Sequence, residues 1–219
     1  TQPKGKKQIL WNKDVACEDL KVGDFVAIQT NKGIFGNKHL PNEAFLLGMY
    51  QGDGTQSKDL IMIDLWENDF DLIPEIESKF AYVCNKYETQ KASNNRTYDI
   101  PKFGNCTPSH SEVKKKRLTS KALKKALNFE KGYVPQWIWE SDEETQWEYI
   151  RGLYYTDGTV GIYSGKGDAI QLSLTSIHHD YLKELQIILA NLGMQSSIRI
   201  LSVGGMRRLP DGKGGHSMY

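Results

Sequence analysis

Long apolar runs, paired cysteines and a large net charge are all missing from this sequence of 219 residues. No stretch approaches the ~18 apolar residues that a membrane span needs. No apolar segment of the signal-peptide type follows the basic N-terminus, so we expect a cytoplasmic protein without a membrane partner. The three cysteines lie apart and none belongs to a Cys-x-x-Cys pair, which argues against a disulfide framework and a structural zinc site.

Several familiar enzyme motifs are absent as well. The sequence has no His-Glu-x-x-His zinc motif, no phosphate-binding P-loop and no Rossmann glycine pattern. It does have the composition of a soluble globular protein, with 39% hydrophobic and 25% charged residues. Its length suits one large domain or two small ones.

The net charge of +1 gives no hint of a nucleic-acid partner, but the charges are unevenly distributed. Basic residues crowd between Lys114 and Lys131 and again between Arg199 and Lys213, whereas acidic residues collect at 64–77 and 140–148. Such segregation is typical of a protein with one basic face. On charge alone, an ordinary solvated surface is an equally good interpretation.

One stretch of the sequence occurs twice. The first copy runs from Ala44 to Thr55 and the second from Glu148 to Thr159, and each ends in Asp-Gly-Thr. The residues after each copy are also alike, because both copies precede the pattern of a strand and then an amphipathic helix. Two α-β-β-α-type halves in tandem are the simplest account of this repeat.

Hydrophobic periodicity and turn residues predict the remaining elements. Helices are expected at 70–87, 119–127 and 178–192, the last with Gly193 as its cap. Strands are expected at 8–11, 25–28, 60–65, 169–174 and 197–201. A turn is expected at 20–24, a linker at 30–41, and a helix that opens at Pro41 or Asn42.

Each copy of the repeat carries two small residues four positions apart, which places both on one face of a helix. They are Gly48 and Gly52 in the first copy and Gly152 and Thr156 in the second. A face of small residues lets two helices approach backbone to backbone, which compensates for the cost of about 1 kcal/mol of a glycine inside a helix. Each helix should end at Asp-Gly, with Gly54 or Gly158 in the left-handed cap conformation.

Pairing the two helices side by side brings Asp53 and Asp157 together at the same end. Two carboxylates at two helix C-termini repel each other and the helix dipoles, which is unfavourable unless a cation lies between them. Mg²⁺ prefers carboxylate and backbone oxygens and keeps several waters. Two such ions ~3.5–4 Å apart can activate a water and stabilise the leaving oxygen of a phosphodiester. The alternative is a pair of helix C-caps packed in a core, which the duplication of the motif makes the weaker interpretation.

In register, the two copies read LLGMYQGDG from Leu46 to Gly54 and IRGLYYTDG from Ile150 to Gly158. They resemble the paired LAGLIDADG motifs of monomeric homing endonucleases, and the resemblance covers residues 42–219. The sequence departs from the family name at the sixth motif position, where Gln51 and Tyr155 stand in place of Asp.

The resemblance implies a complete catalytic centre. The family's catalytic acids fall on Asp53 and Asp157, and both acids are present. We expect these two carboxylates to hold Mg²⁺ together with the carbonyl oxygens of Gly52 and Thr156. Hydrolysis of one phosphodiester in each DNA strand is the activity that the family implies.

The resemblance also implies an α+β fold of two pseudo-symmetric αββαββα-type halves, each laying a curved antiparallel sheet into the major groove. We expect these halves at 41–132 and 133–219, the second shorter than in the family. The implied partner is double-stranded DNA with a long asymmetric target site, bound by a monomer. Basic residues near strand ends are the expected phosphate contacts, with solvated surface charge as the alternative for each: Lys114, Lys116, Arg117, Arg199, Arg207 and Arg208.

A second resemblance concerns inteins. The segment from Trp11 to Ile28 looks like the splicing-domain segment that precedes the endonuclease in inteins, so residues 1–40 are expected to form a short β-rich segment and a linker. Splicing itself is not expected, because the chain shows neither the nucleophile at its first residue nor the terminal His-Asn pair. The block from Tyr133 to Ile138 also resembles one that intein endonucleases carry. Those blocks place a lysine shortly before the proline, and Lys131 is the nearest candidate for this catalytic role, with a solvated loop lysine as the alternative.

The sequence therefore predicts a site-specific, Mg²⁺-dependent homing endonuclease that cuts both strands of duplex DNA at an intein insertion site. Two alternatives of other classes stay open. One is a LAGLIDADG module that binds DNA without cutting it, such as a maturase or a regulator. The other is part of a protein-splicing intein.

Overall fold

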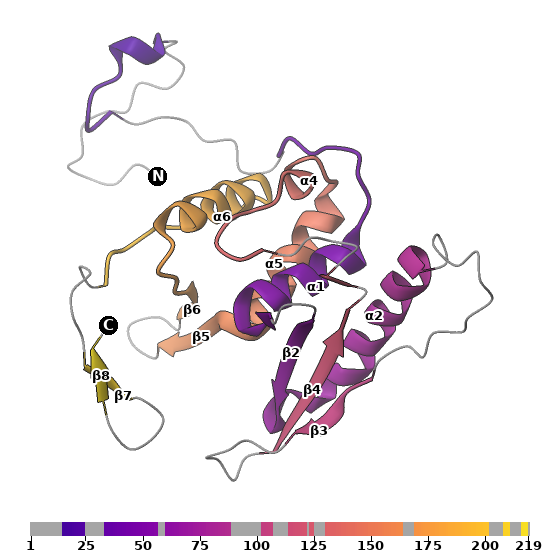
Figure 1. Ribbon diagram of the computed structural model, residues 1–219. Helices are drawn as coiled ribbons and strands as arrows, with labels where there is room; N and C mark the ends of the chain where they lie inside the picture. The colour runs from indigo at the N-terminus through magenta and orange to yellow at the C-terminus, as the bar shows by residue number, and fades with distance from the viewer. Residues whose placement is uncertain are drawn as a thin grey trace.

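The same order of helices and strands occurs twice along the chain (Figure 1). The computed structural model describes residues 15–24, 33–56, 60–88, 102–106, 114–121, 123–124, 130–163, 169–201, 208–210 and 216–218. Within these residues each half consists of a long helix, two strands, a second helix and two further strands. The fold is therefore α+β with antiparallel sheets, as the sequence predicts.

Two helices, α1 (Pro41–Asp53) and α5 (Glu143–Asp157), form the centre of the molecule (Figure 1). Their contact is the most extensive between any two elements in the described part of the chain. Pro41 is pre-organised for the first turn of α1, and the carboxylate of Asp142 caps α5 by accepting from the Thr145 amide at 2.9 Å. Helix α1 is buried on all sides along most of its length, which explains its uniformly apolar pattern.

A four-stranded antiparallel sheet belongs to the first half. Its order is β1-β2-β4-β3. The strands are β1 (Thr55–Gln56), β2 (Ile61–Trp66), β3 (Gly104–Cys106) and β4 (Lys115–Ser120). The 3-10 helix η2 (Glu67–Leu72) leads into α2 (Ile73–Glu88), which covers one face of the sheet (Figure 1). Alternate residues of β2 are buried against this cover, so the sheet has one apolar and one open face.

The second half repeats this arrangement with a smaller sheet. After the short helix α4 (Gln136–Trp139) and α5, strands β5 (Gly158–Tyr163) and β6 (Ala169–Leu174) form an antiparallel pair. Helix α6 (His179–Asn191) follows, and then the antiparallel pair β7 (Arg208–Pro210) and β8 (His216–Met218). Helix α6 buries Tyr181, Leu185 and Ile188.

Several expected elements are confirmed with small shifts. Gly193 has the left-handed conformation, with φ 81°, after α6. The turn at 20–24 forms through the Asp24 amide, which donates to the Lys21 carbonyl at 3.0 Å, and Gly23 within it has φ 101°. It follows η1 (Cys17–Asp19). The strands expected at 8–11 and 25–28 lie outside the described residues.

Three local predictions are wrong. Residues 197–201 form no strand, and Thr119 lies in β4 instead of opening a helix. Gly54 and Gly158 are extended, with φ of −63° and −74°, and not left-handed. A Cβ on either glycine would collide with the tyrosine four residues earlier, so the requirement for glycine here is a matter of space and not of backbone angle.

No disulfide joins the described cysteines Cys17, Cys84 and Cys106. No helix in the described ranges is long and apolar enough to cross a membrane.

Candidate catalytic centre

The contact between α1 and α5 is made backbone to backbone. A Cβ on Gly48 would lie 2.6 Å from the amide nitrogen of Leu153, and one on Gly152 would lie 2.9 Å from the carbonyl carbon of Phe45. No side chain fits at either position, because real Cβ atoms do not approach backbone so closely. The small faces therefore bring the two helix axes together, and both helices end on the same side of the molecule.

At that end the two aspartates become neighbours. A Cβ on Gly52 would lie 2.8 Å from the Cβ of Thr156 and 3.3 Å from the carboxyl carbon of Asp157. Asp53 follows Gly52 as the last residue of α1, just as Asp157 is the last residue of α5. Both carboxylates thus stand at the negative ends of two helix dipoles.

Both aspartates have raised pKa values. Burial by the surrounding protein atoms is the main cause for each, and the negative charge of Asp157 raises the pKa of Asp53 further. The ammonium of Lys131 lowers both pKa values without cancelling these effects. The site therefore disfavours two negative charges and would be stabilised by a cation between them.

Lys131 reaches this site from the loop that precedes α4. Its ammonium donates to the carbonyl oxygen of Gly52 at 2.6 Å and lies 5.6 Å from the centre of the Tyr50 ring. Desolvation lowers the pKa of Lys131 by more than the charges of Asp157 and Asp53 raise it. The structure thus brings this lysine to the two acids, although its spacing in the sequence departs from the family pattern.

The donor set suits a cation that needs few protein ligands. Among the described residues, no group of three His, Cys, Asp or Glu side chains could hold a metal ion. Asp53, Asp157 and the carbonyl oxygens of Gly52 and Thr156 offer carboxylate and backbone oxygen at one end of the helix pair. Mg²⁺ accepts this set, because it is held by one or two carboxylates and keeps several of its waters.

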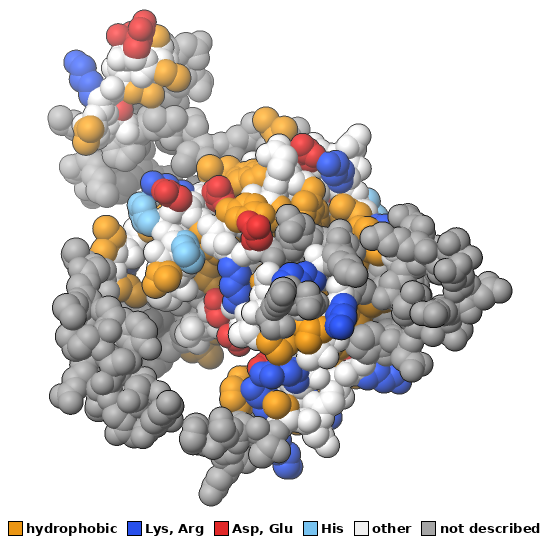
Figure 2. Space-filling view, in the orientation of Figure 1, with side chains coloured by type: hydrophobic (Ala, Val, Ile, Leu, Met, Phe, Trp, Pro, Cys, Tyr) orange, Lys and Arg blue, Asp and Glu red, His pale blue; other side chains and the backbone are white. Residues whose placement is uncertain are grey.

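The open face of the four-stranded sheet carries a charged cluster. Arg117 of β4 donates two hydrogen bonds to Asp64 of β2, at 2.6 and 2.8 Å, and Lys115 donates a third at 2.9 Å. Burial alone would raise the pKa of Asp64, but the hydrogen bonds from Arg117 and Lys115 hold it below its usual value. The cluster keeps a net positive charge, and its three side chains are partly exposed. Lys and Arg side chains lie over the part of the molecule where Figure 1 draws β2 and β4 (Figure 2). The sequence analysis included Arg117 and did not include Lys115.

Three of the other basic candidates, Lys114, Lys116 and Arg199, have described side chains, and their surroundings differ. Lys114 is exposed and pairs with Glu67 at 3.0 Å. Lys116 lies on the covered face of the sheet, with its ammonium 4.7 Å from the centre of the Phe70 ring. Arg199 is exposed in a segment without regular structure. Arg208 belongs to β7 but its side chain is not described, and Arg207 lies outside the described residues.

The sequence analysis missed the role of the sixth motif residue, Gln51. Its side chain is buried and joins α1 to α5, to α6 and to the loop around Lys131. The available signal was a polar residue directly after the apolar run 44–50 of the same helix, since a buried amide is hydrogen-bonded.

Comparison with protein families gives an independent result for the second half. Residues 144–210 match the family model described as LAGLIDADG-like domain. The match includes the second copy of the repeat, with Gly152, Thr156 and Asp157.

The curated relatives are named as subunits of ribonucleoside-diphosphate reductases. The chain is 32% identical over 204 residues to the ribonucleoside-diphosphate reductase NrdEB subunit alpha of Bacillus subtilis (strain 168), covering 91% of this chain and 19% of that protein. The protein of the same name from Bacillus phage SPbeta gives the same values. The ribonucleoside-diphosphate reductase large subunit of Invertebrate iridescent virus 6 is 37% identical over 79 residues, 36% of this chain and 8% of that protein. The chain thus spans about a fifth of the length of the first two relatives.

Among solved structures, I-DmoI in complex with DNA and Ca aligns with a TM-score of 0.48 and 15% identity, over 74% of this chain and 78% of that chain. I-DmoI in complex with DNA and Mn aligns with a TM-score of 0.45 and 14% identity, over 81% of this chain and 87% of that chain.

Proposed function

We propose that this chain, whose second half matches a LAGLIDADG-like domain, is a homing endonuclease that cuts both strands of duplex DNA. The observation that carries the proposal is the pairing of Asp53 and Asp157 at the ends of two helices in backbone contact, beside Lys131. The arrangement is costly for stability, because it collects like charges at two negative helix ends. Such a cost is typical of a functional site.

Mg²⁺ is the proposed cofactor, held by the carboxylates of Asp53 and Asp157 and by the carbonyl oxygens of Gly52 and Thr156. When bound, the ion supplies Lewis-acid stabilisation of phosphodiester oxygens and lowers the pKa of water. The raised pKa values of the two aspartates support this assignment, since a cation between them removes the repulsion that raises the pKa of Asp53.

The chain's own residues have distinct tasks in this proposal. Asp53 and Asp157 would each supply one carboxylate, one from each half, to the cation site at the pseudo-symmetric centre. The ammonium of Lys131 lies 2.6 Å from the Gly52 carbonyl and can stabilise the negative charge that grows on a phosphate oxygen. One lysine beside two acids makes the centre asymmetric, so the two strands need not be cut at equal rates.

The open face of the four-stranded sheet is the proposed DNA-reading surface of the first half. Arg117 can contact a base edge or a phosphate from this face, and Lys114 can contact the backbone. Lys116 is a weaker candidate, because its ammonium lies on the covered face. Both halves belong to one chain, so a monomer that binds a long asymmetric site is the proposed state.

The names of the relatives support an intein origin. Both Bacillus-type relatives are ribonucleoside-diphosphate reductase subunits about five times longer than the matched region. We propose that this chain is an intervening segment of such a reductase and that its target is the uninterrupted reductase gene. The reductase activity itself is a property of the relatives and is not part of this proposal.

A cleavage assay tests the proposed function. The substrate is a plasmid carrying reductase coding sequence with the insertion point joined, and a plasmid in which the insert is present is the control. We expect the parent to linearise the first plasmid with Mg²⁺ and not with EDTA, and to leave the second intact.

Two substitutions test the proposed centre. Asp53→Asn and Asp157→Asn should each lower the cleavage rate at least roughly 10³-fold, because each removes a ligand for the cation. The matched control is Asp180→Asn, which removes a carboxylate at the exposed start of α6 and should cut at the parental rate. Parental rates for the Asp53 and Asp157 variants would refute the assignment, and DNA binding without cleavage by the parent would favour a non-cutting LAGLIDADG module.

A further inference from the structure

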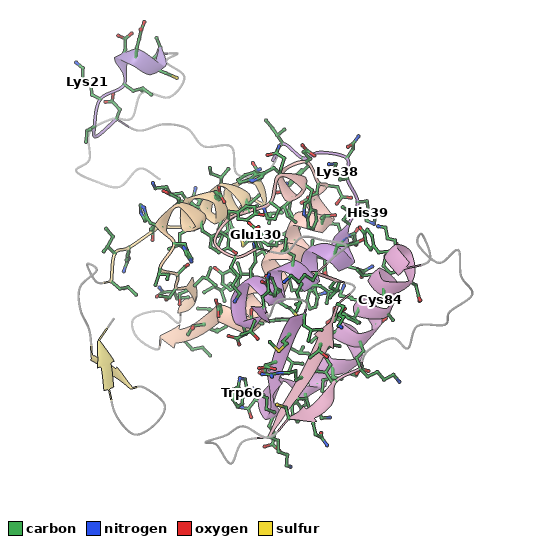
Figure 3. All side chains as sticks on the ribbon, viewed as in Figure 1. Lys21, Lys38, His39, Trp66, Cys84 and Glu130 are labelled. Carbon is green, nitrogen blue, oxygen red and sulfur yellow. The ribbon has the colours of Figure 1, made fainter. Side chains whose placement is uncertain are left out.

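Gln51 is buried at the sixth position of the first motif and forms hydrogen bonds with the loop that carries Lys131. Its amide nitrogen donates to the carbonyl oxygen of Glu130 at 2.9 Å and to that of Tyr133 at 2.8 Å. These carbonyls stand on either side of Lys131 in the sequence. Figure 3 labels Glu130 in the region where α1, α5 and α6 meet.

The oxygen of the Gln51 amide also accepts two hydrogen bonds. The Gln51 Oε1 atom accepts from the hydroxyl of Tyr149 at 2.5 Å and from that of Tyr181 at 3.0 Å. The two hydroxyls lie 2.9 Å from each other. All four hydrogen-bonding positions of the Gln51 amide are therefore used, which is the full capacity of this side chain.

Further contacts hold the loop from its other sides. Gly132 has φ 89°, and a Cβ there would lie 3.3 Å from the His178 ring. The Val134 amide donates to the carboxylate of Glu184 at 2.6 Å. Lys131 thus belongs to a short loop that is hydrogen-bonded to Gln51 and to α6. Gly132 gives this loop its left-handed turn.

The two motifs differ at this point. The residue of the second motif that corresponds to Gln51 is Tyr155, which is 40% exposed and packs edge-to-face on the Phe45 ring at 5.8 Å between centroids. The Tyr155 hydroxyl instead accepts a hydrogen bond from Arg151 of the same helix at 3.3 Å. Gln51 therefore has a task in the first half that its counterpart does not share.

We propose that Gln51 is a positioning residue that sets the place of the Lys131 ammonium beside Asp53 and Asp157 by holding the carbonyls of Glu130 and Tyr133. The proposal rests on the proposed endonuclease function. This role explains why an amide stands at this buried position. An apolar residue of the same size would leave two carbonyls and two tyrosine hydroxyls without their hydrogen bonds to Gln51.

A double-mutant cycle on cleavage tests this role. Gln51→Met and Lys131→Met are made singly and together, and the single-turnover cleavage rate and the DNA affinity in EDTA are measured for each. We expect Lys131→Met to lower the cleavage rate about 10²–10³-fold. Gln51→Met should lower it about 10–10²-fold, because a displaced Lys131 ammonium loses much of its effect on the rate. In the Lys131→Met background, Gln51→Met should change the rate by less than about 3-fold, since it acts through the lysine. DNA affinity should stay within about 3-fold throughout.

Gln51→Glu is the second variant, in case Gln51→Met does not fold. Burial beside two carbonyl oxygens favours the protonated carboxyl, which has one donor where the amide has two, so it cannot hold both Glu130 and Tyr133. Backbone amides at 131–133 should then exchange with deuterium faster than in the parent. The matched control is Gln146→Met, because Gln146 is also buried, lies on α5, and donates to the Ile138 carbonyl of α4 and not to the carbonyls of Glu130 or Tyr133. That control should keep the parental cleavage rate and the parental exchange at 131–133.

Two outcomes would overturn the role of Gln51 while the parent still cuts DNA. One is an equal rate loss from Gln51→Met with and without Lys131. The other is unchanged exchange at 131–133 in Gln51→Glu. A parent that cuts no DNA points instead to failure of the proposed function, and the exchange measurement still decides whether Gln51 holds the loop.

Discussion

At the scale of single residues, the fold uses charged side chains in two opposite ways. Asp53 and Asp157 are left with raised pKa values, whereas Asp64 is surrounded by donors that lower its pKa. The first arrangement lowers the stability of the folded chain at neutral pH, and the second raises it. The raised pKa values belong to the proposed cation site, whereas at Asp64 the protein supplies the cations itself, as Arg117 and Lys115.

The Asp64 cluster gives a prediction for pH-dependent stability. Because the folded-state pKa of Asp64 is lowered, its contribution is present above the unfolded pKa of about 3.9 and is lost as pH falls through the folded value. Asp64→Asn should lower the free energy of unfolding by about 1–2 kcal/mol at pH 7, allowing for partial exposure of its partners. Urea unfolding at a series of pH values should show this difference shrinking below about pH 4.

The control for that experiment is Asp180→Asn. Asp180 also pairs with a lysine, but its side chain is 91% exposed, so its removal should have almost no effect at any pH. A loss at pH 7 as large for Asp180→Asn as for Asp64→Asn would contradict the role given to the Asp64 cluster.

At the scale of elements, the spacing between α1 and α5 decides where the aspartates stand. The helices approach until the position of a Cβ on Gly48 overlaps the backbone of α5. Helix α1 belongs to the first copy of the repeat and α5 to the second. Their close packing therefore joins the two halves of the protein. The same packing explains why both motifs need small residues at this spacing.

Gly48→Ala should therefore destabilise the protein although alanine is the better helix former. The gain of about 1 kcal/mol in helix propensity is outweighed by overlap with backbone that cannot rotate away. We expect a net loss of about 2 kcal/mol in the free energy of unfolding, measured with urea. Gly104→Ala is the matched control, because the nearest atom to its Cβ lies 4.0 Å away. Equal stability of both variants would show that the helices are farther apart.

At the scale of the whole molecule, the two halves are joined by more than the helix pair. Arg151 of α5 donates to Glu75 of α2 at 2.5 Å and to Glu148 at 2.6 Å, and Lys79 of α2 contacts Glu148 at 2.9 Å. The aspartate pair sits on the same seam, with one carboxylate from each half. Binding of a cation at this seam therefore stabilises the assembled molecule rather than one half.

Thermal unfolding should report this linkage. Mg²⁺ at about 100 times its dissociation constant should stabilise the parent by roughly 2.7 kcal/mol, and Asp157→Asn should abolish the rise in Tm. In EDTA the same variant should unfold at a higher Tm than the parent at pH 7. The raised folded pKa of Asp157 means that stability is greatest with the group protonated and is lost as pH rises through that value, so removing the charge restores it. A parent with equal Tm in Mg²⁺ and EDTA would speak against a cation site.

Much of this site could be predicted from the sequence. The repeat, the small residues four positions apart and the Asp-Gly ends are local patterns, and they suffice to predict two helices that pack closely and end in neighbouring acids. Gly193 could be predicted as a helix cap for the same reason, since a cap is specified within a few residues. Gly54 and Gly158 look alike in sequence but are glycines for another reason, the tyrosine ring and carbonyl that occupy the space of a side chain.

The sequence by itself determined the pairing of Asp53 and Asp157, because helical periodicity fixes which residues share a face. Only the tertiary structure decided which donors and charges surround them. Lys131 is 79 positions from the Gly52 carbonyl that it contacts, and Gln51 is 130 positions from Tyr181. Periodicity carries no information over such separations, since those contacts depend on how α6 and the loop before α4 pack against the helix pair.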